Sequence, residues 1–494
     1  MLFNSLTFLV FFSITLIGYF LIPKKARYLW LLAASYYFYA SWNVKYVLLL
    51  LSTTVISYVT ALLLERFSER AKAKALTLTA CLALNLGLLC YFKYFGFLVG
   101  TLQKVLTRLG TGAGISAPEI LLPMGISFYL FQSMGYAVDI YRGTVKAEKN
   151  PLRFALFLSF FPQLVAGPIE RADRLGPQLR NMDQIKVWDA KRIQKGALIM
   201  LYGYFMKMII ADRAAIIVDT VFDPVTYSNY TGFTVWVAAI LFSIQIYCDF
   251  AGYTYIAIGA AKVMGFDLMQ NFHAPYLSRS VKEFWDRWHI SLSKWFRDYL
   301  YFPLGGSRKG KVRKYVNIMI VFLLSGLWHG AGWHFVFWGG MHGILRVLEE
   351  VCTPFYEKHL SKWFHDSFAA RTVKRIVVFL FVTAAWVAFR ASSIRQTFDL
   401  WKSMLKPFNP WVLVDRSLYG LGLDEKDFRV LVLAILFMIL VDLAIHWKKN
   451  LSDAILAQPL WLRWLVLYVG IAAVLIFGIY GAEYNAAEFI YFQF

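Results

Sequence analysis

The chain has 494 residues, of which 59% are hydrophobic and only 16% are charged, and its mean hydropathy is +0.53. A composition this apolar excludes a water-soluble globular protein and indicates an integral membrane protein. The net charge is +21 at pH 7, but the basic residues lie in the connections between apolar runs. There they orient the spans and contact anionic lipids, so we do not interpret the charge as nucleic-acid binding.

Apolar segments long enough to cross a bilayer recur along the whole chain and predict an all-α polytopic protein with about eleven transmembrane helices. No small-residue cleavage site follows the first segment, so it is predicted to be a retained span. No internal repeat stands out, which favours one integral domain. The predicted spans are Leu6–Leu21, Tyr28–Ser41, Val44–Leu64, Ala75–Val99, Leu121–Tyr141, Ala197–Val218, Thr234–Met264, Val316–Leu348, Ile376–Phe389, Val430–His446 and Leu460–Ile479, with Phe154–Val165 as a candidate re-entrant piece.

Basic clusters fall on alternate connections, which gives a consistent orientation under the positive-inside rule. The segment from Arg279 to Lys314 is the most basic of them and is predicted to be cytoplasmic. If Val316–Leu348 turns back as a hairpin, both termini lie on the outside.

Asp249 is a carboxylate in the middle of the predicted span Thr234–Met264. A charge at this depth needs a partner or a water-filled path. It could orient a histidine or satisfy buried donors, and a purely structural hydrogen bond is an equally good interpretation.

The stretch from Asn271 to Lys314 carries ten Lys and Arg residues. Aromatic residues and His289 recur at three- and four-residue spacing within Lys282–Tyr301, which predicts one helix with an aromatic stripe at the cytoplasmic interface. A turn at Gly305-Gly306 follows, and its flanking basic residues suit a phosphate or pyrophosphate. The alternative is that these charges only hold that end of the next span inside. The candidate ligands are Arg308, Lys309 and Lys311.

His329 lies inside the apolar segment Val316–Leu348, in a tract that reads SGLWHGAGWH from Ser325 to His334. An imidazole at membrane depth is costly to keep. Histidine is also the side chain best suited to exchange a proton near neutral pH. A buried histidine beside glycines therefore indicates a catalytic base, whereas a hydrogen-bonded core histidine is the plainer alternative.

Other site chemistries find less support in the sequence. His329, His334 and His342 match no zinc spacing and have no acid nearby, so we expect no metal site. A Ser-His-Asp hydrolase is also disfavoured, because no Gly-x-Ser-x-Gly elbow occurs. The four cysteines lack CxxC spacing, which argues against a disulfide framework and a thiolate nucleophile. They are Cys81, Cys90, Cys248 and Cys352.

Two motifs together resemble the membrane-bound O-acyltransferase family. The first is EFWDRWHISLSKWFRDYLYFPLGG at residues 283–306, and the second is LWHG at residues 327–330, which looks like the motif with the catalytic histidine of that family. Within the family the chain most resembles the bacterial alginate O-acetylation group. The further matching segments are MLFNS at 1–5, PMGISFY at 123–129, VAGPI at 165–169, WVAFRA at 386–391 and FIYF at 489–492.

The resemblance implies a helical bundle around a central channel, with re-entrant and interfacial helices. N-terminal spans would occupy residues 1–141, a catalytic region about 150–390 and C-terminal spans 391–494. It also implies transfer of an acyl group, usually acetyl, from a cytoplasmic thioester such as acetyl-coenzyme A. The group would pass through a bacterial inner membrane to partner acyltransferases of the SGNH type and then to a polysaccharide, with no bound cofactor.

Acyl transfer from a thioester needs a base, donors for the developing oxyanion and the exclusion of water. His329 would be the base and His289 a supporting residue, while the indole N–H of Trp328 or Trp333 would be the oxyanion donor. One departure from the group is Tyr255, where a second acidic residue is expected. Three alternatives remain open: D-alanyl transfer to teichoic acid, a polysaccharide transporter and a scaffolding subunit.

Overall fold

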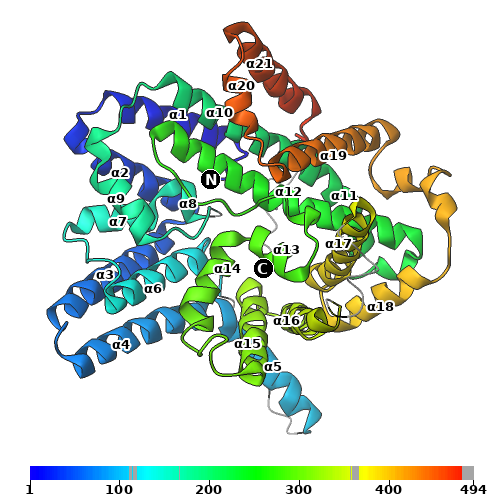
Figure 1. Ribbon diagram of the computed structural model, residues 1–494, viewed down its shortest axis with the longest axis horizontal. Coiled ribbons are helices and arrows are strands. Elements are labelled where there is room, and N and C mark those ends of the chain that lie inside the picture. Colours follow the sequence, from blue (N-terminus) through cyan, green and yellow to red (C-terminus); the bar gives the residue numbers. More distant parts are fainter. Residues whose placement is uncertain (111–113, 115–119, 166, 357, 359–366, 481–494) are drawn as a thin grey trace. The chain divides into compact units, whose positions relative to one another are not determined.

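A computed structural model describes residues 1–110, 114, 120–165, 167–356, 358 and 367–480 (Figure 1). The described residues form helices and turns and contain no strand, which confirms the all-α prediction. The chain divides into two compact units: unit 1 comprises Met1–Gly196 with Ala257–Met269, and unit 2 comprises Ala197–Ile256 with Gln270–Phe494. Two of the segments that resemble the family are affected: residue 166 of VAGPI and the whole of FIYF at 489–492 lie outside the described part.

Unit 1 is built around α3, α4 and α6, which lie side by side at the blue and cyan end of Figure 1. Small polar residues line their contact: the Ser57 hydroxyl hydrogen-bonds that of Ser133, which donates to Asn85 at 3.3 Å. The predicted re-entrant piece forms two short buried helices, α7 and α8. The helices of this unit are α1 (Leu6–Leu21), α2 (Arg27–Ala40), α3 (Val44–Arg66), α4 (Ala71–Leu89), α5 (Phe95–Arg108), α6 (Ile126–Arg142), α7 (Pro151–Ser159), α8 (Phe161–Leu164) and α9 (Ala172–Arg180).

Unit 2 carries the two family motifs, and its helices α15 and α16 pack along each other as a hairpin (Figure 1). Two helices, α10 (Ala190–Tyr204) and α12 (Phe233–Met264), have residues in both units. The remaining helices are α11 (Asp212–Phe222), α13 (Val281–Arg287), α14 (Ile290–Phe296), α15 (Lys311–His329), α16 (Trp333–Phe355), α17 (Phe368–Arg390), α18 (Ile394–Leu405), α19 (Glu425–His446), α20 (Leu451–Leu456) and α21 (Leu460–Phe477).

Six helices of the described chain are long and apolar enough to cross a bilayer: α3, the continuous run Ala71–Arg108, α12, α17, α19 and α21. They correspond to six of the eleven predicted spans. The helix α1, with 16 residues, is apolar but shorter. The remaining predicted spans fall on α2, α6, the α10–α11 region and the α15–α16 hairpin. The protein is therefore multi-pass, while the number of its spans stays a prediction.

The prediction of one continuous interfacial helix over Lys282–Tyr301 is wrong. The helix α13 ends at Arg287 and α14 starts at Ile290, because His289 adopts a left-handed backbone conformation that interrupts the helical hydrogen bonds. The aromatic stripe also does not face lipid: Trp288 and His289 are fully buried within the protein.

Candidate active site

The α15–α16 hairpin places His329 at the last helical position of α15. The chain then turns through Gly330, Ala331 and Gly332 before α16 begins at Trp333, so the segment Val316–Leu348 does turn back as a hairpin. A Cβ atom at Gly330 would overlap the ring of Phe335, so a larger residue at this position would displace that ring.

His329 lies in an aromatic enclosure and is only 3% exposed. Its ring centroid is 5.0 Å from that of Trp328, 5.1 Å from that of Trp338 and 5.4 Å from that of Phe389. Such surroundings exclude bulk water, which a reaction with a hydrolysable thioester requires.

His289 occupies the break between α13 and α14 with φ +44°. Asn271 holds this turn: its carbonyl oxygen accepts from the Ile290 N–H at 3.0 Å, and its side-chain oxygen accepts from the Ser291 hydroxyl at 2.6 Å. Left-handed backbone is unfavourable for most residues other than glycine, and it persists only where the surroundings enforce it. The turn therefore fixes where the imidazole of His289 points.

The structure brings the two predicted histidines together. The ring centroids of His289 and His329 are 6.2 Å apart, and the indole of Trp328 lies 5.8 Å from His289. Three of the predicted site residues thus form one buried cluster, although they come from segments forty residues apart.

Asp249 of α12 has the partner that its depth demands. The Lys207 ammonium lies 2.6 Å from Asp249 and 2.8 Å from Asp212, and all three side chains are almost completely buried. A close approach of α10 and α12 at Gly203 and Gly252 makes this possible, since a Cβ on either glycine would meet the backbone of the other. The next residue of α12, Phe250, contacts His289 with ring centroids 4.7 Å apart.

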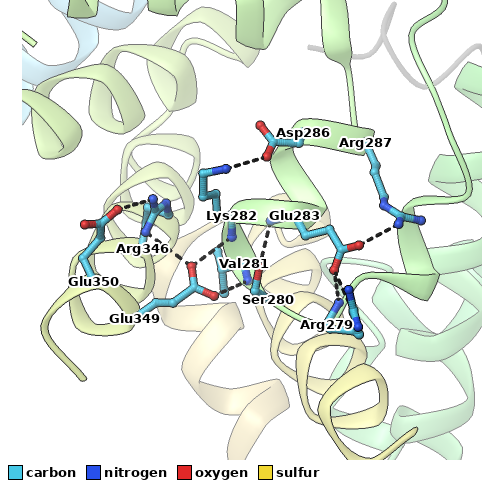
Figure 2. A network of polar contacts seen from close by, with 10 residues as sticks. All are labelled: Arg279, Ser280, Val281, Lys282, Glu283, Asp286, Arg287, Arg346, Glu349 and Glu350. Carbon is cyan, nitrogen blue, oxygen red and sulfur yellow. Dashed lines mark hydrogen bonds and ion pairs between the residues drawn. The ribbon is translucent and has the colours of Figure 1, made fainter. Parts of the chain in front are cut away.

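An ion-pair network joins the start of α13 to the end of α16 (Figure 2). The carboxylate of Glu349 accepts from the backbone N–H groups of Val281 and Lys282 at 2.8 and 3.0 Å, which satisfies donors that the helix itself leaves open. Arg346 pairs with both Glu349 and Glu350. The network therefore ties the His289 segment to the hairpin that carries His329.

Comparison with known proteins agrees with this arrangement. The sequence profile of the membrane-bound O-acyltransferase family matches residues 145–389. A probable alginate O-acetylase of Azotobacter vinelandii is 35% identical over 93% of this chain and 87% of its own length.

The chain belongs to the membrane-bound O-acyltransferase family.

It is thus an O-acyltransferase and a multi-pass membrane protein. Other relatives of this acyltransferase carry different names. A peptidoglycan O-acetyltransferase of Helicobacter pylori is 33% identical over 82% of this chain and 80% of its own. A teichoic acid D-alanyltransferase of Bacillus subtilis is 28% identical over 54% of this chain and 68% of its own.

The other predicted site residues of the acyltransferase lie outside the buried cluster. Trp333 is 53% exposed at the start of α16. Arg308 and Lys309 lie on the turn that precedes α15 and Lys311 is the first residue of that helix; all three are exposed. Among the residues that the structure describes, no group of three or more His, Cys, Asp or Glu side chains is placed to hold a metal ion.

Several residues of the acyltransferase site were not singled out in the sequence. Lys207 lies far from the motifs along the chain, and Asn271 lies eighteen residues before His289, so no local signal pairs them with Asp249 and His289. His342, considered above only as a metal ligand, accepts a hydrogen bond from the Trp285 indole at 3.3 Å and is fully buried. Its depth in an apolar helix was the one signal that could have marked it.

Proposed function

We propose that this O-acyltransferase moves an acetyl group from a cytoplasmic thioester, acetyl-coenzyme A or another acyl thioester, for O-acetylation of an exported polysaccharide such as alginate. The observation that carries the proposal is the buried pair of His289 and His329, which lies in the region that the family profile matches. Similarity to O-acetylases over most of the chain supports acetyl rather than D-alanyl transfer, because the D-alanyltransferase relative matches only about half of it.

In the proposed reaction His329 is the general base. Its imidazole takes the proton from an acceptor hydroxyl while the hydroxyl oxygen forms a bond to the thioester carbonyl carbon. The carbon–sulfur bond then breaks, and the leaving thiolate takes the proton back from the imidazolium. The proton balance closes without a metal or a second base.

The remaining site residues have supporting roles in this proposal. Trp328 is better placed than Trp333 to donate its indole N–H to the developing oxyanion, because its ring is 5.0 Å from that of His329. His289 aligns His329 or the donor. Asp249 acts through its ion pair with Lys207, which fixes α12 where Phe250 supports His289.

The donor and acceptor would reach the site from opposite faces of a bacterial inner membrane. Arg308, Lys309 and Lys311 would contact donor phosphates on the cytoplasmic side. On the other side an SGNH-type acyltransferase would pass the acetyl group to the polysaccharide. Lipids surround the apolar helices, and no nucleic acid takes part.

Thioester consumption by purified protein in liposomes tests the proposal. Replacing a general base usually costs about 10²–10⁴-fold in rate, so His329→Ala should lose acetyl transfer by that factor while remaining folded. His334→Ala is the matched control, because His334 lies in the same tract but is only partly buried. A His329→Ala protein that kept more than half of the wild-type rate would remove His329 from this role.

A further inference from the structure

His446, the last residue of α19, lies between two arginines of different segments. Its Nδ1 atom is 3.0 Å from a guanidinium nitrogen of Arg287, at the end of α13, and its Nε2 atom is 3.1 Å from one of Arg375, on α17. All three side chains are partly exposed, so a ligand outside the protein can reach them.

The triad has more hydrogen-bond donors than acceptors. A neutral imidazole has one N–H donor and one lone-pair acceptor, whereas a guanidinium has donors only. His446 can therefore accept from one arginine, while its N–H faces an N–H of the other. A protonated His446 would add a third positive charge and leave no acceptor at all. An oxyanion would supply the missing acceptors.

Positive charge also exceeds negative charge around the triad. Glu283 pairs with Arg287 at 2.6 Å and lies between it and Arg279, as Figure 2 shows. Arg375 forms no ion pair with an acid in the described part of the chain, and its Nε–H donates to the Leu277 carbonyl at 3.1 Å. Burial and the Arg287 guanidinium lower the pKa of the nearby His273 imidazole. A net positive potential therefore remains.

The triad is at the right place for the phosphate end of a long substrate. Arg287 is two residues before His289, and α17 runs from Arg375, in its first half, to Phe389, which contacts His329 near the C-terminal end of the helix. Arg375 and Phe389 are fourteen positions apart, which corresponds to about 21 Å of helix. In coenzyme A and in acyl carriers alike, an extended pantetheine arm separates the phosphate from the thioester sulfur.

We propose that Arg287, Arg375 and His446, supplemented by Arg279, bind a phosphate group of the thioester donor. Guanidinium groups recognise phosphate through paired, charge-assisted hydrogen bonds, which fits this donor-rich arrangement. The inference rests on the proposed function, and it gives one donor phosphate a set of ligands in addition to the basic turn at Arg308. Binding here directs the pantetheine arm along α17 toward the two histidines.

Direct binding measurements test the site. The probe is desulfo-coenzyme A, which keeps the phosphates and has no thiol to acylate, and the comparison ligand is pantetheine, which has no phosphate. Titration calorimetry in a detergent without phosphate groups gives both affinities. Arg287→Gln and Arg375→Gln each remove charge-assisted hydrogen bonds to the phosphate, so each variant should bind the probe roughly tenfold more weakly, or weaker still. The affinity for pantetheine should stay unchanged.

Two further variants guard against general effects. Arg429→Gln removes one positive charge from the other end of α19, where Arg429 is exposed and pairs with Glu425, and should leave probe affinity unchanged. Arg375→Lys keeps the charge but loses the planar fork, and should give an intermediate affinity. It also covers the case in which Arg375→Gln fails to fold.

The other outcomes contradict either the site or the proposed function. Unchanged probe affinity in the arginine variants, with an intact wild-type rate of thioester consumption, contradicts the site and leaves the proposed function standing. If the probe affinity falls only in a variant neutralised at Arg308, Lys309 and Lys311, the basic turn and not the triad binds the phosphate. If the arginine variants lose bound phosphatidylglycerol while their probe affinity is unchanged, the triad is a lipid site. A wild-type protein that binds the probe but consumes no thioester contradicts the function instead.

Discussion

Gly326 of α15 and Gly339 of α16 face each other so closely that neither position has room for a Cβ atom. A Cβ on Gly326 would lie 3.2 Å from the Gly339 Cα and well under 3.0 Å from the Phe335 carbonyl oxygen; one on Gly339 would meet the Phe322 carbonyl in the same way. These clashes involve backbone atoms, which cannot rotate aside. The contact therefore fixes how α15 and α16 are positioned along each other, and with it the position of His329 at the end of α15.

Alanine at either glycine should separate the hairpin. Although alanine favours a helix over glycine by about 1 kcal/mol, the backbone clash should outweigh this and destabilise the protein by about 1–3 kcal/mol. We expect Gly339→Ala to lower both the unfolding temperature in detergent and the rate of acetyl transfer. Gly340→Ala is the control, because its Cβ would meet only a Leu323 side chain at 3.5 Å. Equal behaviour of the two variants would contradict the steric argument.

Two variants of His289, in its left-handed turn, distinguish the role of its backbone from that of its imidazole. Asparagine tolerates this conformation better than alanine, so His289→Asn should be more stable than His289→Ala. If the imidazole supports the reaction, both variants lose turnover or apparent donor affinity to a similar extent. Unfolding temperatures and steady-state kinetics measure the two effects separately. Full activity in both variants would leave His289 a structural residue.

The buried ion cluster around Lys207 makes a second stability prediction. Lys207→Met leaves Asp249 and Asp212 without their common cation, and breaking a buried pair costs about 3–5 kcal/mol. Adding Asp249→Asn to this variant removes one of the two stranded carboxylates and should recover part of the loss. Thermal unfolding of the single and double variants checks this. A double variant less stable than Lys207→Met would contradict the coupling between the two residues.

The basic turn before α15 is tested by neutralising Arg308, Lys309 and Lys311 while Arg313 and Lys314 are kept to preserve orientation. Contact with donor phosphates predicts weaker and less salt-sensitive donor binding with unchanged topology, because screened charge–charge attraction is lost. Donor titrations at two ionic strengths, with cysteine-accessibility mapping of the topology, give the answer. Donor binding that is unaffected at low ionic strength would leave this turn a membrane anchor only.

The sequence predicted those features that depend on local pattern. The break after His329 follows from Gly330 and Gly332, and the depth of the histidine follows from the apolar residues around it. The break at His289 was missed because helical periodicity continues through it. What interrupts the helix is Asn271, eighteen residues upstream, whose two oxygens take the donors of the turn. Such a contact forms only after the chain has folded back on itself.

The partner of Asp249 was missed for a related reason. The need for a partner follows from the depth of the carboxylate, but its identity depends on which helix packs against α12. Gly203 and Gly252 decide that, and nothing in either glycine alone indicates the other. The roles within the histidine pair follow from the family resemblance, and the variants described above test them.

The enclosure of His329 has a kinetic consequence. Only 3% of the surface of His329 is exposed, so we expect an acceptor to reach the imidazole when an aromatic neighbour changes rotamer. The Gly326–Gly339 contact holds the helices themselves, so the movable parts are the rings of Trp328, Trp338 and Phe389. Ring rotation in a packed interior is slower than at a surface. We therefore expect these rotations to limit turnover wherever they are slower than the removal of the proton by His329.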